Sequence, residues 1–169
     1  ATATEKEVIA FLLKEPEQAA GCSIHELAER TFSSTSTVIR LCQKTGFRGY
    51  KEFQQSLLYE LAIRTLVMNR GNMQVNKMHK KTANLVKADA QAHFYLLLEE
   101  ELTDAEKAAY RRGRNAKSFT MPKHATMKDY RMATGFEALM GYLYLTEQFD
   151  RMAELLGKGL EQMGELISL

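Results

Sequence analysis

The feature that most constrains the fold of this chain is the spacing of its prolines. The 169 residues contain two, Pro16 and Pro122, and none lies between them. Proline removes a backbone donor and disrupts helix interiors, so a long proline-free stretch can accommodate long helices. Alternation of apolar and polar residues is absent, and the apolar residues recur at helical spacing. We therefore predict an all-α chain, with a helix-turn-helix bundle followed by a second helical domain.

Composition narrows the class of protein further. The chain is 45% hydrophobic and 26% charged, which is typical of a globular protein. The two cysteines, Cys22 and Cys42, cannot build a disulfide framework and do not form a CxxC pair. No apolar run reaches the roughly 18 residues that a membrane span needs, and no leader segment is evident. We expect a cytoplasmic protein without a membrane partner.

The distribution of charge points to a polyanion partner. The net charge is only +2. However, residues 61–88 and residues 107–128 contain lysine and arginine and no acidic residue. Two acid-free basic stretches favour nucleic-acid binding. The alternative is that both are solvated faces balanced by Glu99, Glu100 and Glu101.

The N-terminal third predicts a helix-turn-helix. Thr4 with Glu7 has the spacing of a capping box, and the first helix should end near Lys14. Ser23 with Glu26 predicts a second capping box and a helix that ends near Arg30. Residues 31–33 then form a turn, and Ser34 is the expected N-cap of a third helix that stops near Gly46. Two short helices joined by three residues fit a helix-turn-helix, and the alternative is a plain helical bundle with a polar face.

The third helix carries the candidate DNA-binding side chains. Small hydroxyl residues at its start allow close approach to a major groove, and Arg40 can reach a guanine edge or a phosphate. Basic residues further along would face backbone phosphates. The predicted DNA-binding residues are Ser34, Thr35, Ser36, Thr37, Arg40, Lys44 and Arg48.

A family resemblance supports this interpretation. Residues 23–53 read SIHELAERTFSSTSTVIRLCQKTGFRGYKEF, which resembles the N-terminal domain of RpiR-family transcription regulators. Ser33 and Ser36 depart from the family pattern. The resemblance implies a DNA-binding domain over residues 1–60. RpiR regulators normally continue into a sugar-phosphate-binding α/β domain, and nothing after Arg64 has that pattern.

The remaining two thirds predict further helices. Residues 50–69 form one long helix, with Phe53, Leu57, Leu61 and Val67 at helical spacing, and Gly71 should stop it. The later segments are one or two helices in 75–101, a helix 104–113 opened by a Thr103–Glu106 capping box, a loop 115–126, and helices 128–146 and 148–167. The last helix has an apolar stripe of Met152, Leu155, Leu156, Leu160 and Met163.

This second part has its own resemblance. Residues 108–145 read AAYRRGRNAKSFTMPKHATMKDYRMATGFEALMGYLYL, and residues 79–92 read HKKTANLVKADAQA. Both segments are similar to Mini-ribonuclease III, the ribonuclease III catalytic domain without a separate double-stranded-RNA-binding domain. Phe119, His124 and Asp89 depart from the family pattern. The resemblance implies a domain over residues 61–169, joined to the first through a seam helix at about 50–69.

The resemblance implies hydrolysis of double-stranded RNA by a Mg²⁺-dependent homodimer that matures ribosomal RNA. Mg²⁺ prefers oxygen ligands and supplies the nucleophile and charge neutralisation. Glu137 matches a metal-binding catalytic carboxylate. The family's other acid is an aspartate in a G-D-A-x-Y-E motif, and Ser56 stands at its position here. Glu60, one turn along the same helix, is the candidate that could compensate.

The same resemblance implies a set of RNA-binding residues. Basic side chains there would bind phosphates along an A-form duplex, where shape is recognised more than sequence. The predicted RNA-binding residues are His79, Lys80, Lys81, Arg111, Arg112, Arg114, Asn115, Lys117, Ser118 and Lys123.

Three functional hypotheses follow. The first is a protein of the double-stranded-RNA endonuclease class whose cleavage is impaired because the first catalytic aspartate is missing; whether it is an active enzyme stays open. The second is a DNA-binding transcription regulator that acts through the helix-turn-helix. The third is a pair of folded but inert halves that bind nucleic acid weakly, without sequence preference or turnover.

Overall fold

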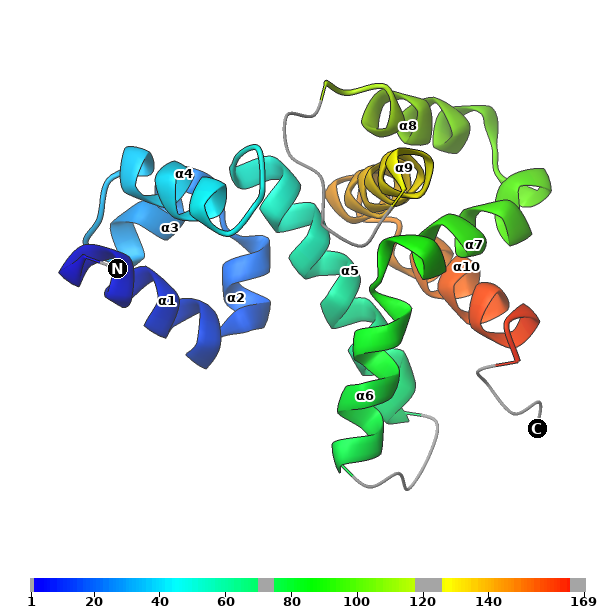
Figure 1. The fold of residues 1–169 in the computed structure, drawn as a ribbon, viewed down its shortest axis with the longest axis horizontal. Helices are drawn as coiled ribbons and strands as arrows, with labels where there is room; N and C mark the ends of the chain where they lie inside the picture. Colours follow the sequence, from blue (N-terminus) through cyan, green and yellow to red (C-terminus); the bar gives the residue numbers. More distant parts are fainter. Residues whose placement is uncertain (1, 70–74, 118–125, 165–169) are drawn as a thin grey trace. The chain divides into compact units, whose positions relative to one another are not determined.

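The structure, a computed structural model, describes residues 2–69, 75–117 and 126–164 (Figure 1). These residues form helices joined by short connections, and no β-strand occurs among them. The expected all-α fold is confirmed. The chain divides into two compact units at Leu58 and Tyr59, a boundary that falls inside one long helix.

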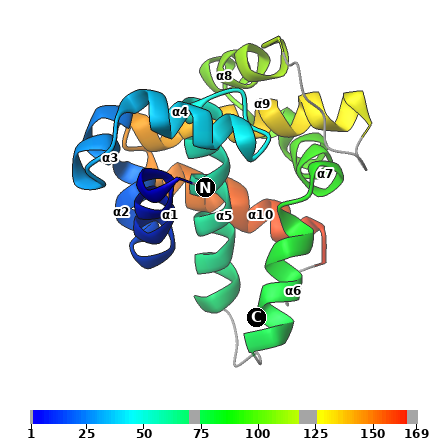
Figure 2. The ribbon, with the colours of Figure 1, turned by 60° about the vertical axis from the view of Figure 1, so that its left-hand side comes forward.

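The two units follow each other along the chain (Figures 1 and 2). The first contains α1 (Ala3–Lys14), α2 (Pro16–Gly21), α3 (Ile24–Arg30), α4 (Thr35–Lys44) and the start of α5 (Tyr50–Asn69). The second contains the rest of α5, α6 (Val75–Leu85), α7 (Ala88–Leu98), a 3₁₀ turn η1 (Glu99–Glu101), α8 (Asp104–Arg114), α9 (Met127–Leu145) and α10 (Phe149–Gln162).

Capping boxes begin three of these helices. The boxes predicted at Ser23–Glu26 and Thr103–Glu106 are confirmed. The box predicted at Thr4–Glu7 is wrong, because Thr2 and Glu5 form it instead. Thr2 has an extended backbone and its hydroxyl accepts from the Glu5 N–H, so Thr4 lies inside the helix.

Proline does more than end the first helix. The structure contains a short helix, α2, that the sequence interpretation did not predict. Pro16 occupies its first position, where the missing N–H needs no partner and the fixed φ angle suits a helix. Glu15 therefore ends α1 and begins α2 at once.

Four of the described helices are followed by a residue with positive φ. These residues are Phe32 after α3, Gly46 after α4, Glu147 after α9 and Gly164 after α10, with φ of 48°, 98°, 57° and 69°. After the first three, the next N–H donates to a carbonyl five residues back, as Ser33 N does to Ala28 O at 2.8 Å. Glycine adopts this conformation without strain, whereas Phe32 and Glu147 carry a Cβ.

The first unit has a small core. Val8, Leu27 and Val38 are almost fully buried at its centre. Tyr50 at the start of α5 packs with them, and its hydroxyl donates to the carbonyl of Cys22 at 2.6 Å. Burial raises the pKa of Tyr50, so this hydroxyl stays a donor. The core thereby joins α1, α3, α4 and α5, and Cys22, directly after α2, belongs to it as well.

The second unit has a larger core centred on α9. Helices α7, α8 and α10 pack against α9, which Figure 1 shows nearly end-on. Gly113 of α8 lies directly against Thr134 and Ala138 of α9, where a side chain would collide. Gly135 of α9 is equally close to the Tyr110 ring. These contacts bring α8 and α9 closer than larger residues would allow.

The buried face of α5 differs from the predicted one. Leu57 and Leu61 are only partly buried, whereas Tyr59 and Ile63 are buried in the core of the second unit together with Val67. Spacing of four and eight residues places these three on one face of the helix. By contrast, the stripe predicted on α10 is confirmed: Leu155, Leu156 and Leu160 are buried, and Met152 and Met163 pack beside them.

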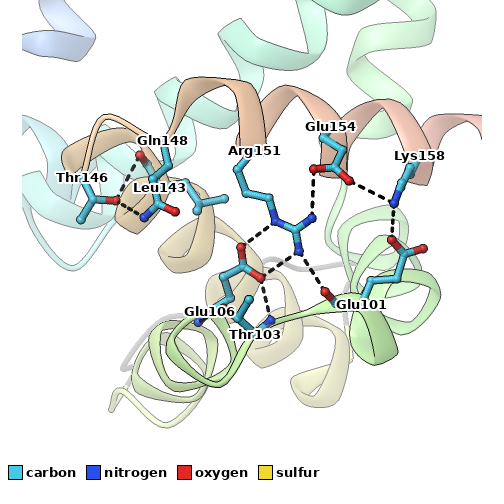
Figure 3. Close-up of polar contacts among 9 residues, drawn as sticks. All are labelled: Glu101, Thr103, Glu106, Leu143, Thr146, Gln148, Arg151, Glu154 and Lys158. Atoms are coloured by element: carbon cyan, nitrogen blue, oxygen red, sulfur yellow. Dashed lines mark hydrogen bonds and ion pairs between the residues drawn. The ribbon is translucent and has the colours of Figure 1, made fainter.

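A polar network ties the start of α8 to α10 (Figure 3). Arg151 of α10 donates through Nε and Nη2 to both carboxylate oxygens of Glu106, at 2.9 and 3.1 Å. Its Nη2 also donates to the carbonyl of Glu101, and its Nη1 to Glu154. Lys158 then bridges Glu154 and the Glu101 carboxylate. A bidentate arginine–carboxylate pair fixes both orientation and distance.

Candidate functional site

The first candidate site is the exposed side of α4. The turn between α3 and α4 is closed by Thr31, whose hydroxyl donates to Leu27 O at 2.8 Å. Ser34 caps α4 as predicted, and its Oγ accepts from the Thr37 N–H at 3.2 Å. Ser36 is exposed and Thr35 is partly exposed.

The structure corrects the expected exposure of Thr37, one of the predicted DNA-binding residues. We expected its hydroxyl on the exposed face, but the residue is buried. Its Oγ1 shares a hydrogen bond with Ser34 Oγ at 3.0 Å, inside the N-terminal cap of α4. The residue therefore stabilises the start of the helix.

Two of the predicted DNA-binding cations contact one buried acid. Lys44 Nζ lies 2.6 Å from Glu5 Oε1, and Arg40 Nε lies 3.3 Å from the same oxygen. Glu5 is fully buried, while 55% of the Arg40 side chain and 53% of the Lys44 side chain are exposed. Hydrogen bonds from Lys44 and from the Thr2 backbone lower the pKa of Glu5 to about 2. The carboxylate is therefore ionised beneath two surface cations.

Arg48 has a similar arrangement. Its Nε lies 3.2 Å from Glu52 Oε2, and its backbone N–H donates to the same oxygen at 2.6 Å. Glu52 is buried and the Arg48 side chain is 24% exposed. This contact fixes the approach of the chain to α5.

The second candidate site surrounds Glu137 on α9. Gln91 of α7 is buried, and its Nε2 donates to Glu137 Oε1 at 3.0 Å and to Val86 O at 2.9 Å. Both neighbours are pure acceptors, so the nitrogen of the amide must face them. Gln91 Oε1 is buried and has no hydrogen-bond partner among residues 2–69, 75–117 and 126–164. The pair joins α7 to α9 through the candidate carboxylate.

Tyr59 packs beside this pair. Its ring meets Phe136, the neighbour of Glu137, edge-on at a centroid distance of 5.5 Å. Its hydroxyl donates to Leu85 O at 3.0 Å. Burial, and then the carboxylate of Glu137, raise the pKa of Tyr59 far above its ordinary value. The side chain stays neutral and serves packing.

Glu60, the candidate compensating acid, is already paired. Its Oε1 lies 2.6 Å from Arg64 Nη2, one turn further along α5. Both side chains are over one third exposed, so this pair is weak in water. Ser56 lies one turn before Glu60 on the same helix and offers only a hydroxyl.

The side chains of Ser56, Glu60 and Glu137 do not fit a resident Mg²⁺. A hard cation needs several oxygen ligands, usually with more than one carboxylate. The described part of the chain contains no group of three or more His, Cys, Asp and Glu side chains that could hold a metal. Glu137 supplies one carboxylate, Ser56 is neutral, and the Glu60 carboxylate contacts Arg64 of its own helix.

The predicted RNA-binding residues are distributed over two places. Arg111, Arg112 and Arg114 are exposed near the end of α8, and Asn115 caps that end. Lys80 is exposed on α6, which lies far from α8 in both views (Figures 1 and 2). The other members divide as follows: Lys81 is partly exposed on α6, Lys117 is exposed beyond α8, and the side chain of His79 and all of Ser118 and Lys123 lie outside the described residues.

The end of α8 combines its cations with an aromatic pair. The rings of Tyr95 and Tyr110 stack at 3.5 Å with an interplanar angle of 3°. The Arg114 guanidinium lies 5.9 Å from the centre of the Tyr110 ring. Arg114 Nε also donates to Asn115 Oδ1 at 3.2 Å. The cations near the helix C-terminus also oppose the partial negative charge of the last carbonyls.

Sequence reasoning missed Glu5 and Gln91. Glu5 had a local signal, since Thr2 and Glu5 also have capping-box spacing, but nothing local indicated that Arg40 and Lys44 would reach it. Gln91 had no signal, because its partners lie 5 and 46 residues away. Both contacts depend on how the helices pack.

Comparison with known proteins defines the class. The ribonuclease III domain family matches residues 56–148, and the chain belongs to this family. The helix-turn-helix domain of the rpiR family matches residues 1–64. Both resemblances proposed from the sequence are therefore confirmed.

The similar proteins within this family include several Mini-ribonucleases 3. Mini-ribonuclease 3 of Clostridium tetani is 46% identical over 100 residues, which cover 59% of this chain and 66% of the relative. Mini-ribonuclease 3 of Enterococcus faecalis is 44% identical over 110 residues, covering 64% of this chain and 83% of the relative. The crystal structure of protein FN1578 from Fusobacterium nucleatum superimposes with a TM-score of 0.57 at 25% identity, over 68% of this chain and 90% of that one.

The alignment with the Clostridium relative therefore covers only part of this chain and only part of that protein. The chain spans about two thirds of the length of the Clostridium relative.

Among the described helices, none is long and apolar enough to cross a membrane.

Proposed function

We propose that the second unit binds double-stranded RNA as a ribonuclease III domain and that its cleavage is impaired. The observation that carries this proposal concerns the three positions expected to supply the catalytic groups. Ser56 has a neutral hydroxyl, the Glu60 carboxylate pairs with Arg64, and the Glu137 carboxylate accepts a hydrogen bond from Gln91. The family match and the Mini-ribonuclease 3 relatives support the RNA class. A homodimeric state, a cytoplasmic location and membership of the class that matures ribosomal RNA belong to this proposal.

The chain's own residues account for binding. The arginines at the end of α8 would contact phosphates of an A-form duplex, and the stacked Tyr95–Tyr110 pair would keep that end rigid. Loss of arginine side chains there should weaken binding and lower its salt dependence. Glu137 would contribute an oxygen ligand only if a second acid were supplied nearby.

A paired binding and cleavage assay tests this proposal. A labelled duplex RNA is incubated with Mg²⁺ and the parent chain, Ser56→Asp, Ser56→Asn or Ser56→Asp/Glu137→Gln, and binding is measured by fluorescence anisotropy. We expect all four proteins to bind and only Ser56→Asp to cut, because it restores a carboxylate. Ser56→Asn is the matched control, since it changes size without adding charge.

Each departure from that pattern has a meaning. Cutting by the parent chain would overturn the impairment, and Glu60→Gln would then show whether Glu60 supplies the second acid. Cutting by Ser56→Asn would contradict the need for a carboxylate. Absence of duplex-RNA binding in all four proteins would overturn the RNA proposal itself.

We propose duplex-DNA binding by the first unit as a second function. The specific observation is the exposed side of α4, where Ser36 and Arg40 lie beyond a cap formed by Ser34. The rpiR helix-turn-helix match supports it. One helix-turn-helix makes few contacts, so tight binding requires a dimer and two half-sites. Selection of bound duplexes from a random pool should yield a motif that Arg40→Ala no longer enriches, whereas an unenriched pool with the parent chain would exclude this function.

A further inference from the structure

Glu5 is the one buried acid that contacts two predicted DNA-binding residues, among the contacts described above. One carboxylate oxygen, Oε1, receives Lys44 Nζ at 2.6 Å and Arg40 Nε at 3.3 Å. The other, Oε2, accepts the Thr2 N–H at 2.8 Å. Both oxygens are therefore engaged, and the side chain is inaccessible to solvent.

We propose that Glu5 is a positioning residue of the duplex-DNA face, holding Arg40 and Lys44 of α4 in the orientation that meets the nucleic acid. The proposal rests on DNA binding by the first unit. It assigns a role to α1, an element outside the helix-turn-helix itself. DNA would contact the two cations, and Glu5 would act only through them.

The geometry explains how an acid can support binding to a polyanion. A guanidinium carries five N–H donors, and Glu5 uses only the Nε–H of Arg40. The terminal nitrogens, which make bidentate contacts with guanine or phosphate, are not used by Glu5. Arginine loses side-chain entropy when it binds, and a fixed Nε reduces that loss.

The burial of Glu5 distinguishes a positioning role from simple competition with DNA for the two cations. A surface acid could exchange its cations with DNA phosphates, but Glu5 lies beneath Arg40 and Lys44, whose side chains remain half exposed. The cluster carries one negative and two positive charges, so its sum stays positive. If competition dominated instead, removing the negative charge would strengthen binding.

A double-mutant cycle distinguishes these cases. The duplex enriched by the parent chain is titrated by fluorescence anisotropy with the parent, Glu5→Gln, Arg40→Ala and the double variant. We expect each single variant to bind about tenfold more weakly, because a well-placed arginine–base contact is worth about that factor. The combined loss in the double variant should be smaller than the product of the two single losses, because only Lys44 is then left for Glu5 to position. Equal or tighter binding by Glu5→Gln would overturn the proposal, as would additive losses.

A matched control separates positioning from folding of α1. Thr2→Ala removes the hydroxyl that accepts the Glu5 N–H, but leaves the Glu5 carboxylate and both cations in place. We expect it to bind DNA like the parent chain while lowering the stability of the first unit. If Thr2→Ala weakened binding as much as Glu5→Gln, the effect of Glu5 would be structural only and the proposal would fail.

Two further readouts do not depend on that comparison. The slope of log K against log salt concentration should fall by about 1 in Lys44→Ala and stay unchanged in Glu5→Gln, since only the first removes a phosphate-binding cation. In ¹H–¹⁵N spectra without DNA, the Arg40 Nε–H resonance should be protected from exchange in the parent and lost from that position in Glu5→Gln. A protected resonance with no enriched duplex would reject the DNA function alone, whereas an unprotected resonance would reject the positioning role.

Discussion

The two units use the same local motif for different purposes. Glu5 and Glu106 each occupy the third position of a helix opened by a capping box, and each carboxylate accepts the N–H of the capping threonine. In the first unit the carboxylate also contacts two half-exposed cations. In the second unit it binds Arg151, whose side chain is 24% exposed.

The difference shows that a cap does not determine its distant partner. Glu106 binds Arg151 in a bidentate pair, and Arg151 also donates to the Glu101 carbonyl, so the network links the start of α8 to α10. The contact of Glu5 with Arg40 and Lys44 leaves both cations at the surface. The Glu106–Arg151 pair is largely shielded from solvent, whereas Arg40 and Lys44 stay half exposed on α4.

The largest expected effect tests whether the units are energetically separate. Leu155→Ala in the second core and Leu27→Ala in the first core should each lower the free energy of unfolding by about 3 kcal/mol, because both side chains are fully buried. Hydrogen exchange resolved by peptide should show the loss in the mutated unit alone. Equal loss of protection in both units would contradict the comparison.

The Arg151 network should contribute next. Arg151→Ala leaves the buried Glu106 carboxylate without its partner and should destabilise the second unit by about 2 kcal/mol in urea denaturation. Lys158→Ala is the control, since its pairs are more exposed and should cost at most about 0.5 kcal/mol. A comparable loss in both variants would show that burial of the pair does not matter.

The same pair predicts a pH dependence. The hydrogen bond from Arg151 lowers the pKa of Glu106 below its ordinary value. The stabilisation that the Glu106–Arg151 pair contributes is therefore complete above the pKa of Glu106 in the unfolded chain, about 4.3. It is lost as the pH falls through the lower pKa of Glu106 in the folded chain. The stabilities of the parent and Arg151→Ala should therefore converge in acid. A difference that stayed constant to pH 2 would exclude this origin.

The close packing of α8 on α9 should give a smaller effect. In Gly135→Ala the new Cβ would lie 2.6 Å from Tyr110 Cε2, and stacking on Tyr95 restrains that ring. We expect destabilisation of about 1.5 kcal/mol, measured by thermal denaturation. Gly49→Ala in the first unit meets no atom within 4 Å and is the matched control. A larger loss at Gly49 would argue against tight packing as the cause.

The smallest effect concerns helix ends and has the opposite sign. Phe32 and Glu147 adopt φ of 48° and 57°, and Phe32 is 93% exposed. Phe32→Gly and Glu147→Gly should each stabilise their own unit by about 0.5 kcal/mol, because relief of strain slightly exceeds the entropy cost of glycine. Calorimetry would detect the shift, and Gly46→Ala, at φ 98°, should shift the midpoint downward.

Much of the fold was predictable because its signals are local. The ends of α3 and α4, the caps at Ser23, Ser34 and Thr103, and the stripe of α10 all follow from residues within one or two turns. The cap of α1 was misplaced because Thr2 and Thr4 both precede a glutamate by three residues. The spacing was equivalent, and only the backbone conformation of Thr2 decided between them.

The candidate sites were less predictable. Thr37 has an ordinary recognition-helix sequence, yet its side chain turns inward to Ser34. The resemblance placed Glu137 in a catalytic role, but nothing in the sequence indicated that Gln91 would donate to it. The buried face of α5 shifted to Tyr59 and Ile63 because the core of the second unit selects that side.

The sequence by itself determined the helical class, most helix boundaries and both family resemblances. These properties depend on local spacing and residue identity. Only the tertiary structure decided which acid meets which cation: Glu5 with Arg40 and Lys44, and Glu106 with Arg151. These partners are 35 to 45 residues apart, and they meet because burial of the apolar faces sets the helix packing. The hydrophobic effect is non-directional, so the spacing of residues within one helix does not show which other helix it will pack against.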